Sequence, residues 1–237
     1  MSGTRAGPPH DETQEGRLLA RPRVPSVMAP ERGTRPLGLG ARRDGLLHVP
    51  SGYQPHRPAP LVVMLHGAGG NAHHALAPWR ELADEAGLIL LAPDSRGSTW
   101  DFIVEGGFGK DVAFLDQALA FVFERCAVDP TRLALEGFSD GASYALSLGL
   151  TNGDLFTHVV AFSPGFLAPA AQRGHPALFV AHGVKDTVLR IDPCSRRIVP
   201  RLEHAGYPVR YHEFDGPHTV PEDIAREALA WFSSPHT

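Results

Sequence analysis

Short apolar runs recur along this chain, and stretches with helical spacing separate most of them. A continuously apolar run of strand length is typical of a strand that is covered on both faces. The predicted strands are residues 61–65, 88–92, 132–136, 158–162, 177–181 and 209–214. Strands that alternate with helices predict an α/β fold with a mostly parallel central sheet and helices on both faces.

Apolar residues spaced three and four apart predict the helices between these strands. They are expected from near Pro78 to Gly87, over 112–126, directly after residue 139 and around 198–205. A last helix is expected to open at Thr219, whose hydroxyl would form a capping box with Glu222, and to bury Ile224, Ala228 and Trp231.

The N-terminal part of the chain has a different composition. Residues 1–34 are rich in Arg, Pro, Gly and Glu and poor in bulky apolar side chains, which predicts a disordered or loosely attached tail. A hairpin is expected next, with strands at 37–41 and 46–50 around Asp44-Gly45. The remaining residues, 35–237, are predicted to form a single domain.

One turn between a predicted strand and a predicted helix contains a serine at its apex. The pentapeptide Gly137-Phe138-Ser139-Asp140-Gly141 fits G-x-S-x-G and follows the apolar run that contains Leu133 and Leu135. In this context the pattern indicates a nucleophile elbow, in which a strained backbone exposes the serine hydroxyl and glycines keep side chains out of a crowded crossing. We therefore interpret Ser139 as a catalytic nucleophile, the alternative being an ordinary strand-to-helix turn.

Composition and charge narrow the classes of partner. The 237 residues are 43% hydrophobic and carry a formal net charge of −4, so the chain has no basic excess that would favour nucleic acid. No apolar segment approaches the roughly 18 residues of a membrane span, and no signal-peptide pattern opens the sequence. A cytoplasmic protein without stable membrane insertion is expected.

Few residues suggest a metal or a disulfide. Cys126 and Cys194 are placed in predicted helices and are expected to be reduced thiols. His73 and His74 are adjacent but lack a carboxylate or thiol at matched spacing. No metal and no cofactor are therefore expected.

A serine nucleophile needs a general base and a group that orients this base. His218 follows the last predicted strand and precedes the last helix, which leaves its ring on a loop at the edge of the sheet where the strands end. His212 lies within a predicted strand and His204 within a helix, so both are expected to have structural roles. His218 is the predicted base.

The orienting acid is sought on a loop after another late strand. Asp186 follows the run at 177–181 in the segment His182-Gly183-Val184-Lys185-Asp186 and is the predicted acid. Asp192 and Asp215 are the alternatives, but Asp192 is better suited to cap a helix and Asp215 is only three residues from the predicted base.

Two backbone amides are candidates for an oxyanion hole. They are those of Asp140, at the start of the elbow helix, and Ala68, in the glycine-rich loop that follows residues 61–65. A flexible turn or a phosphate loop is the alternative for 66–70, although the lysine of a P-loop is missing. The side chain of Asp140 is expected to be a helix N-terminal carboxylate favoured by the dipole.

With these residues in place, the chain resembles the α/β-hydrolases, and within them the phospholipase/carboxylesterase family of acyl-protein thioesterases and small polyhydroxybutyrate-depolymerase-like esterases. Residues 65–70, 137–141, 182–186 and 216–218 carry the resemblance, which extends over about 36–232. It implies an α/β-hydrolase fold and hydrolysis of carboxylic esters through an acyl-enzyme without a cofactor. Asp140 stands where the thioesterase members usually have glutamine, which weakens the link to thioesters.

The connection between the strands at 158–162 and 177–181 bears on substrate size. Residues 163–176 are too few for a helical lid, so no lid domain is predicted and short to medium acyl chains are favoured. Trp100, Phe102 and Phe166 are candidate pocket walls, with ordinary packing as the alternative.

The sequence therefore predicts a serine carboxylesterase that acts on a small-molecule ester. A thioesterase or lysophospholipase is the alternative within the enzymes, and a non-catalytic ligand-binding hydrolase fold is the alternative outside them. A homodimer is compatible with the sequence but is not indicated by any motif.

Overall fold

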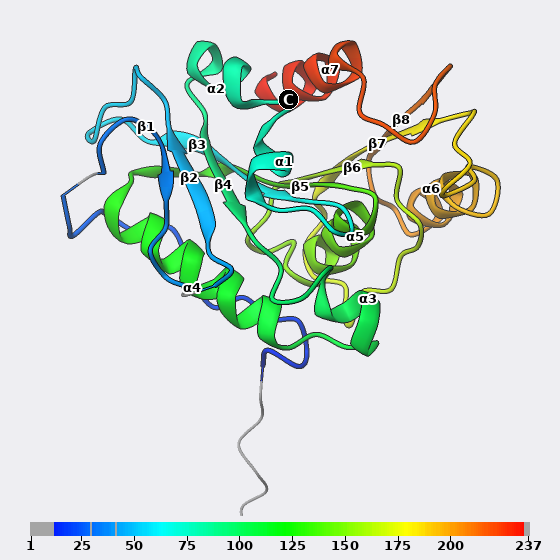
Figure 1. Ribbon diagram of the computed structural model, residues 1–237, viewed down its shortest axis with the longest axis horizontal. Coiled ribbons are helices and arrows are strands. Elements are labelled where there is room, and N and C mark those ends of the chain that lie inside the picture. Colours follow the sequence, from blue (N-terminus) through cyan, green and yellow to red (C-terminus); the bar gives the residue numbers. More distant parts are fainter. Residues whose placement is uncertain (1–11, 29, 41, 235–237) are drawn as a thin grey trace, which may run out of the picture.

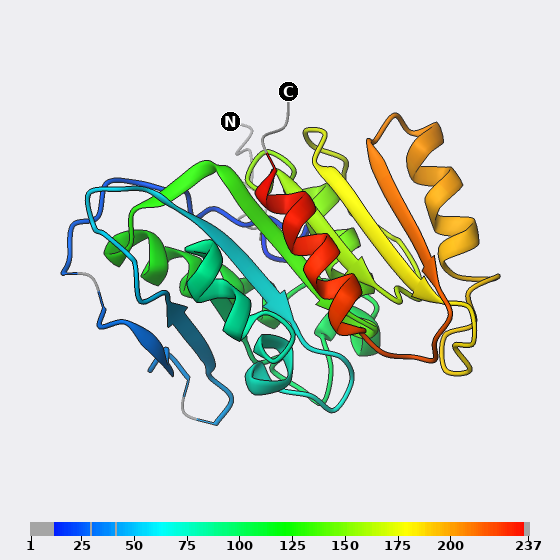
Figure 2. The ribbon, with the colours of Figure 1, turned by 90° about the horizontal axis from the view of Figure 1, so that it is seen from above.

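The computed structural model describes residues 12–28, 30–40 and 42–234, and an eight-stranded sheet runs through its centre (Figure 1). The strands are β1 (Gly33–Pro36), β2 (Gly45–Val49), β3 (Ala59–Leu65), β4 (Ile89–Pro93), β5 (Val128–Phe138), β6 (His158–Phe162), β7 (Ala177–Gly183) and β8 (Val209–Phe214). Their spatial order is β1-β2-β4-β3-β5-β6-β7-β8, so β1 and β8 form the two edges (Figure 2). β2 pairs antiparallel with β1 and β4, whereas the strands from β4 to β8 pair in parallel, which confirms the predicted fold class.

Helices cover both faces of this sheet. They are α1 (Ala72–Leu76), α2 (Arg80–Ala86), α3 (Asp101–Glu105), α4 (Lys110–Arg125), α5 (Asp140–Thr151), α6 (Ser195–His204) and α7 (Glu222–Ser233). One apolar layer joins α1, α2 and α7 to the sheet, and the other joins α4, α5 and α6 to its opposite face (Figure 1). Parallel strands covered in this way need apolar side chains on both faces, which explains the uninterrupted apolar runs of the sequence.

The predicted hairpin is present, but its first strand is displaced. β1 ends at Pro36, and the described residues 37–40 and 42–44 form no strand; the last residue of the strand expected over 37–41 lies outside the described part of the chain. The carboxylate of Asp44 accepts hydrogen bonds from the amides of Gly38, Leu39 and Gly40 at 2.8–3.0 Å. These bonds satisfy amides that would otherwise pair in a ladder, so the chain turns before Asp44-Gly45 is reached.

Two helix starts differ from the sequence-based expectation, and one short helix was not expected. The helix expected near Pro78 begins at Arg80, and the short α1 precedes it, with the side chain of Asn71 accepting from two backbone amides of its first turn. α7 begins at Glu222 with Pro221 as its N-cap and no side-chain cap, so the capping box expected at Thr219 is wrong. Extended Pro221 places the helix start later than the hydroxyl could reach.

The N-terminal segment is also different from the expected loose tail over its described part, which begins at residue 12. Leu18 is fully buried in the layer of α4 and α5. The guanidinium of Arg17 donates to the Thr151 carbonyl, to the Asn152 side chain and to the Asp154 carboxylate, each at 2.9–3.0 Å. Buried Leu18 and hydrogen-bonded Arg17 therefore attach this segment to the domain, although its average composition is polar.

A buried pair of carboxylates holds the long connection from β4 to α4. Asp111 is almost fully buried, and its two oxygens accept from the amides of Arg96 at 2.5 Å and Asp101 at 2.6 Å. The Asp101 carboxylate in turn accepts from the Asp111 amide at 2.8 Å and from the Tyr144 hydroxyl at 3.2 Å. Burial raises the pKa of Asp111 to about 6. These bonds fix both ends of a loop that passes beside the carboxyl ends of the strands.

Replacing the buried leucine of the N-terminal segment tests whether this segment stabilises the fold. Leu18→Ala is expected to lower the free energy of unfolding by about 3 kcal/mol, because it leaves a cavity in a closed apolar layer. Val24→Ala, at a side chain that is 88% exposed, should change it by less than about 0.5 kcal/mol. Urea unfolding of both variants gives the comparison, and equal effects would mean that the segment is not anchored by Leu18.

The carboxylate pair predicts a pH dependence of stability. Asp111 has a higher pKa in the folded chain than its ordinary value, so between about pH 6 and pH 4 the folded state takes up a proton that the unfolded state does not. This contribution to stability is therefore complete below about pH 4 and is lost as the pH rises through 6. Relative to Asp111→Asn, the wild type should gain roughly 1.4 kcal/mol between pH 7.5 and pH 5. Urea titrations at both pH values measure this difference, and a constant difference would contradict it.

Candidate active site

Ser139 occupies a strained junction between β5 and α5. Its backbone has φ 57° and ψ −120°, a left-handed conformation that is uncommon for a residue with a side chain. The amide of Ser139 donates to the carbonyl of Phe162 at 2.9 Å, which ties the turn to β6. A side chain at Gly137 would collide with the backbone of Gly141, so the glycines allow strand and helix to cross closely. These features form the elbow that the sequence pattern predicts.

Two further loops bring an imidazole and a carboxylate to this serine. Nε2 of His218 lies 2.9 Å from Oγ of Ser139, and Nδ1 of His218 lies 2.5 Å from Oδ2 of Asp186. The three residues follow β5, β7 and β8, so all of them lie at the carboxyl ends of the parallel strands. Because an ionised carboxylate can only accept, Nδ1–H of His218 donates to it, and Nε2 is left to accept the serine proton.

The acid of this chain is itself held by several donors. The second oxygen of Asp186 accepts from the amides of Val188 and Leu189, each at 2.8 Å. Burial by itself would raise the pKa of Asp186, but the hydrogen bond from His218 and those from the two amides outweigh it and hold the pKa below its ordinary value. The carboxylate is therefore charged and fixed beside the imidazole at neutral pH.

The alternative residues named from the sequence lie elsewhere. Asp192 pairs with Arg196 at 2.8 Å, and Asp215 pairs with Lys185 at 2.6 Å, both at the surface. His212 faces Glu227 at 3.1 Å on β8. Within the described residues none of these side chains is hydrogen-bonded to or ion-paired with His218 or Ser139.

A second histidine at the acid was not assigned a role from the sequence. His182 is fully buried, with Nε2 2.7 Å from the Leu189 carbonyl and 3.2 Å from Oδ2 of Asp186, and Nδ1 2.7 Å from Oγ of Ser195. Burial lowers the pKa of His182, so the ring is neutral, donates from Nε2 and accepts the Ser195 hydroxyl. It fixes the loop that contains Asp186, and its only signal in the sequence is its place between a buried strand and a glycine.

The candidate oxyanion donors lie on two different segments next to the nucleophile. Asp140 is the first residue of α5, and Ala68 lies in the loop between β3 and α1. This loop passes close to the serine, because a Cβ built on Gly67 would lie 3.3 Å from Cβ of Ser139. No backbone or side-chain acceptor in the described residues is paired with the amide of either residue. Two unengaged amides beside a nucleophile are suited to a developing negative charge.

The three candidate pocket residues have different environments. Trp100 is fully buried, stacks on Tyr144 with centroids 5.1 Å apart and donates from Nε1 to the His66 carbonyl at 2.9 Å, so its assignment as an accessible pocket wall is wrong. Phe102 is half-buried and Phe166 is 37% exposed, with ring centroids 5.8 Å apart.

The segment between β6 and β7 brings Phe166 towards the nucleophile. The Gly165 amide donates to Oγ of Ser143, one helical turn after Ser139, at 2.9 Å. Residues 163–176 form no helix, so they do not build a helical lid. Phe166, and with it the neighbouring ring of Phe102, is therefore placed near the first turn of α5, which begins directly after Ser139.

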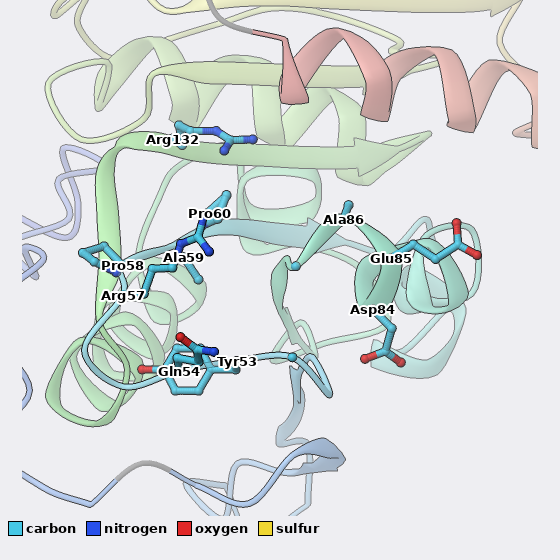
Figure 3. A pocket seen from close by; sticks show the side chains of 12 residues that line it. Tyr53, Gln54, Arg57, Pro58, Ala59, Pro60, Asp84, Glu85, Ala86 and Arg132 are labelled. Carbon is cyan, nitrogen blue, oxygen red and sulfur yellow. The ribbon is translucent and has the colours of Figure 1, made fainter.

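A hollow of about 370 Å³ lies near the amino ends of β3 and β5 (Figure 3). None of its lining residues belongs to the site around Ser139. Ala59 and Arg132, which line it, belong to the amino-terminal parts of β3 and β5. Arg57 and Asp84 supply charges of both signs. Its size does not make it the reaction site, because the serine and its partners are at the other ends of these strands.

Two other findings concern the described residues as a group. None of their helices is both long and apolar enough to span a membrane. They contain no cluster of three or more histidine, cysteine or acidic side chains that could hold a metal ion, and His73 and His74 are in α1. Cys126 and Cys194 are buried free thiols at helix ends.

Known proteins similar in sequence include esterases. Feruloyl esterase C of Emericella nidulans is 29% identical over 158 residues, which cover 63% of this chain and 57% of that protein. The poly(3-hydroxybutyrate) depolymerase of Ralstonia pickettii is 30% identical over 116 residues, which cover 42% of this chain and 24% of that protein. The chain spans just over half of the length of the first relative.

Solved structures show the same fold. Esterase PE8 is 25% identical with a TM-score of 0.64, and the match covers 81% of this chain and 98% of that one. The S-formylglutathione hydrolase FrmB of Staphylococcus aureus has a TM-score of 0.71 at 15% identity, over 88% of this chain and 100% of that one, which shows the fold alone. The family model named Esterase matches residues 38–181, more than half of the chain. The resemblance to α/β-hydrolase esterases is thus confirmed, and the chain belongs to the Esterase family.

Proposed function

We propose that the protein is a serine carboxylesterase with an open site for esters of short to medium or flat aromatic acids. The observation that carries the proposal is the hydrogen-bonded series Ser139–His218–Asp186. It is assembled from three loops at the carboxyl ends of the parallel strands. A nucleophile, a base and an orienting acid in this order are sufficient for acyl transfer without a metal or an organic cofactor.

The first half of the reaction forms an acyl-enzyme. As Oγ of Ser139 attacks the ester carbonyl, its proton moves to Nε2 of His218, and the imidazolium is stabilised by Asp186. The carbonyl oxygen becomes an oxyanion within reach of the amides of Ala68 and Asp140. His218 then gives the proton to the departing alkoxide, and the alcohol leaves while the acyl group stays on Ser139.

The second half returns the free enzyme. A water molecule gives a proton to Nε2 of His218 and attacks the acyl carbonyl, which again forms an oxyanion at the same two amides. The imidazolium returns its proton to Oγ of Ser139 as the carboxylic acid leaves. Neutral His182 keeps its hydrogen bonds throughout, because it contacts Asp186 and not the reacting atoms.

The aromatic surface beside the serine favours one class of acyl group. Phe166 is partly exposed and its ring lies 5.8 Å from that of Phe102, so a flat acyl group can pack against an aromatic wall. The feruloyl esterases among the relatives are named for an aromatic acyl group, and this supports feruloyl esters as a second candidate beside simple alkanoates.

Substitution of the three hydrogen-bonded residues tests the mechanism directly. Ser139→Ala and His218→Ala are expected to reduce kcat for p-nitrophenyl butyrate by about 10⁶-fold and Asp186→Asn by about 10⁴-fold, because the three groups act as a unit. Asp192→Asn and Asp215→Asn, at surface ion pairs, should stay within about twofold of the wild type. A fluorophosphonate should label the wild type and not Ser139→Ala. Turnover and labelling that survive Ser139→Ala would overturn the proposal.

Shortening the exposed phenylalanine tests the acyl site. Phe166→Ala is expected to lower kcat/KM for methyl ferulate and p-nitrophenyl octanoate about tenfold, because the acyl group loses an apolar contact. The rate with p-nitrophenyl acetate should change less than about twofold, since the acetyl group is too small to reach this ring. Leu19→Ala, at an exposed side chain of the N-terminal segment, is the control and should leave all three substrates unaffected. Equal losses for acetate and ferulate would exclude Phe166 as an acyl contact.

A further inference from the structure

The segment Ser95–Trp100, between β4 and α3, contacts both backbone regions that contain the candidate oxyanion amides. Towards the loop of Ala68, the Gly69 amide donates to the Ser98 carbonyl at 2.7 Å and Nε1 of Trp100 donates to the His66 carbonyl at 2.9 Å. Towards the elbow, the hydroxyl of Thr99 donates to Oδ2 of Asp140 at 2.7 Å. Neighbouring residues 98 and 99 therefore hold the two halves of the oxyanion hole.

These two contacts limit how far the oxyanion amides can move apart. Ala68 precedes Gly69, which is fixed by residue 98, and the Asp140 amide belongs to the residue that Thr99 holds. The two donor segments follow different strands, β3 and β5, which pair in the sheet. The elbow packs closely against the end of β3, but no hydrogen bond in the described residues joins the Ala68 loop directly to Asp140. A link through one peptide unit fixes their separation much more tightly than packing of two loops would.

The segment is rigid enough for this task. Asp111 accepts from the amides of Arg96 and Asp101 on either side of Thr99. From the other direction, the guanidinium of Arg43 donates to the Ser95 carbonyl and, at 3.0 Å, to the Gly70 carbonyl. Thr99 itself is only 6% exposed. A hydroxyl fixed by such surroundings can impose a position on its partner.

The hydrogen bond from Thr99 to Asp140 also affects the electrostatics of the oxyanion hole, because Asp140 has a carboxylate side chain. It belongs to the residue whose amide faces the developing oxyanion, and a free negative charge so close would oppose that oxyanion. The Thr99 hydroxyl donates to this carboxylate and holds it on the side of residues 95–100. This orientation limits how strongly the carboxylate opposes an oxyanion at the Asp140 amide.

We propose that Thr99 is a positioning residue for the oxyanion hole, and that residues 98 and 99 set the separation of the Ala68 and Asp140 amides. The inference rests on the proposed esterase function. The transition state depends on the oxyanion contacts more than the bound ester does, so a misplaced amide lowers kcat with little change in KM.

The first test removes the hydroxyl and then restores it. Thr99→Val, which is similar in shape to threonine, should lower kcat for p-nitrophenyl butyrate about tenfold with KM within about twofold, and Thr99→Ser should recover most of the loss. Thr131→Val is the matched control, because Thr131 donates to Asp129 at 2.7 Å in the exposed first part of β5, and it should leave kcat unchanged. An unchanged kcat in a folded Thr99→Val, or an equal loss in Thr99→Ser, would overturn the proposal.

A tetrahedral inhibitor reports the hole without turnover. Phenylboronic acid forms a tetrahedral adduct with the serine, and its Ki should rise in Thr99→Val by a factor similar to the loss of kcat. Asp140→Ala removes the other end of the same contact and provides a second route if Thr99→Val does not fold. The double variant should be no worse than Asp140→Ala, because both changes break one interaction. Additive losses, or an unchanged Ki, would contradict the positioning role.

These outcomes are separate from those that concern the esterase itself. A wild-type protein that hydrolyses no ester and binds neither fluorophosphonate nor phenylboronic acid would overturn the proposed function. An active wild type whose Thr99→Val variant keeps its kcat would overturn only the role of Thr99.

Discussion

The left-handed backbone of Ser139 is the constraint on which the site depends. A residue with a side chain in this region costs on the order of 1–3 kcal/mol, so it persists only where the surroundings determine it. Here the Ser139 amide is bound to β6, and its carbonyl accepts from the amides of Ala142 and Ser143 in the first turn of α5. The central strand and a buried helix thereby hold a turn that neither would adopt alone. The hydroxyl is left where the parallel strands end, and this position determines where the proposed base and acid must lie.

Parallel strand order supplies those groups from distant parts of the chain. β7 and β8 follow β6 across the sheet and run parallel to it. The loops that contain Asp186 and His218 therefore lie at the same ends of the strands as the elbow. The precision comes from local bonds and not from the sheet itself. Asp186 is oriented by two backbone amides on one oxygen and faces two imidazoles, those of His218 and His182, with the other. Because Asp186 is held by so many partners, it fixes the orientation of the His218 ring.

The sequence predicted the parts of the molecule that depend on neighbouring residues. The strands follow from apolar runs, and Ser139, Asp186 and His218 follow from their positions directly after such runs. It could not predict contacts between residues far apart, such as the link from Thr99 to Asp140, which are 41 positions apart. Trp100 was placed at a pocket wall because an aromatic residue in a loop has the same pattern whether it is buried or exposed. The loose tail was wrong over residues 12–28 because average composition gives little weight to one buried residue, Leu18.

The N-terminal segment is also connected, through packed aromatic rings, to the phenylalanines of the candidate acyl site. A side chain at Gly16 would collide with the ring of Phe108, so the two lie in direct contact. Phe108 stacks on Phe102 with centroids 4.4 Å apart, and Phe102 lies beside Phe166. A continuous row of packed groups thus extends from the N-terminal segment to the aromatic surface next to the nucleophile. Residues 163–176 add no helix over these rings. The proposed acyl surface is therefore supported by the N-terminal segment, which lies outside the sheet, and has no helical lid formed by 163–176.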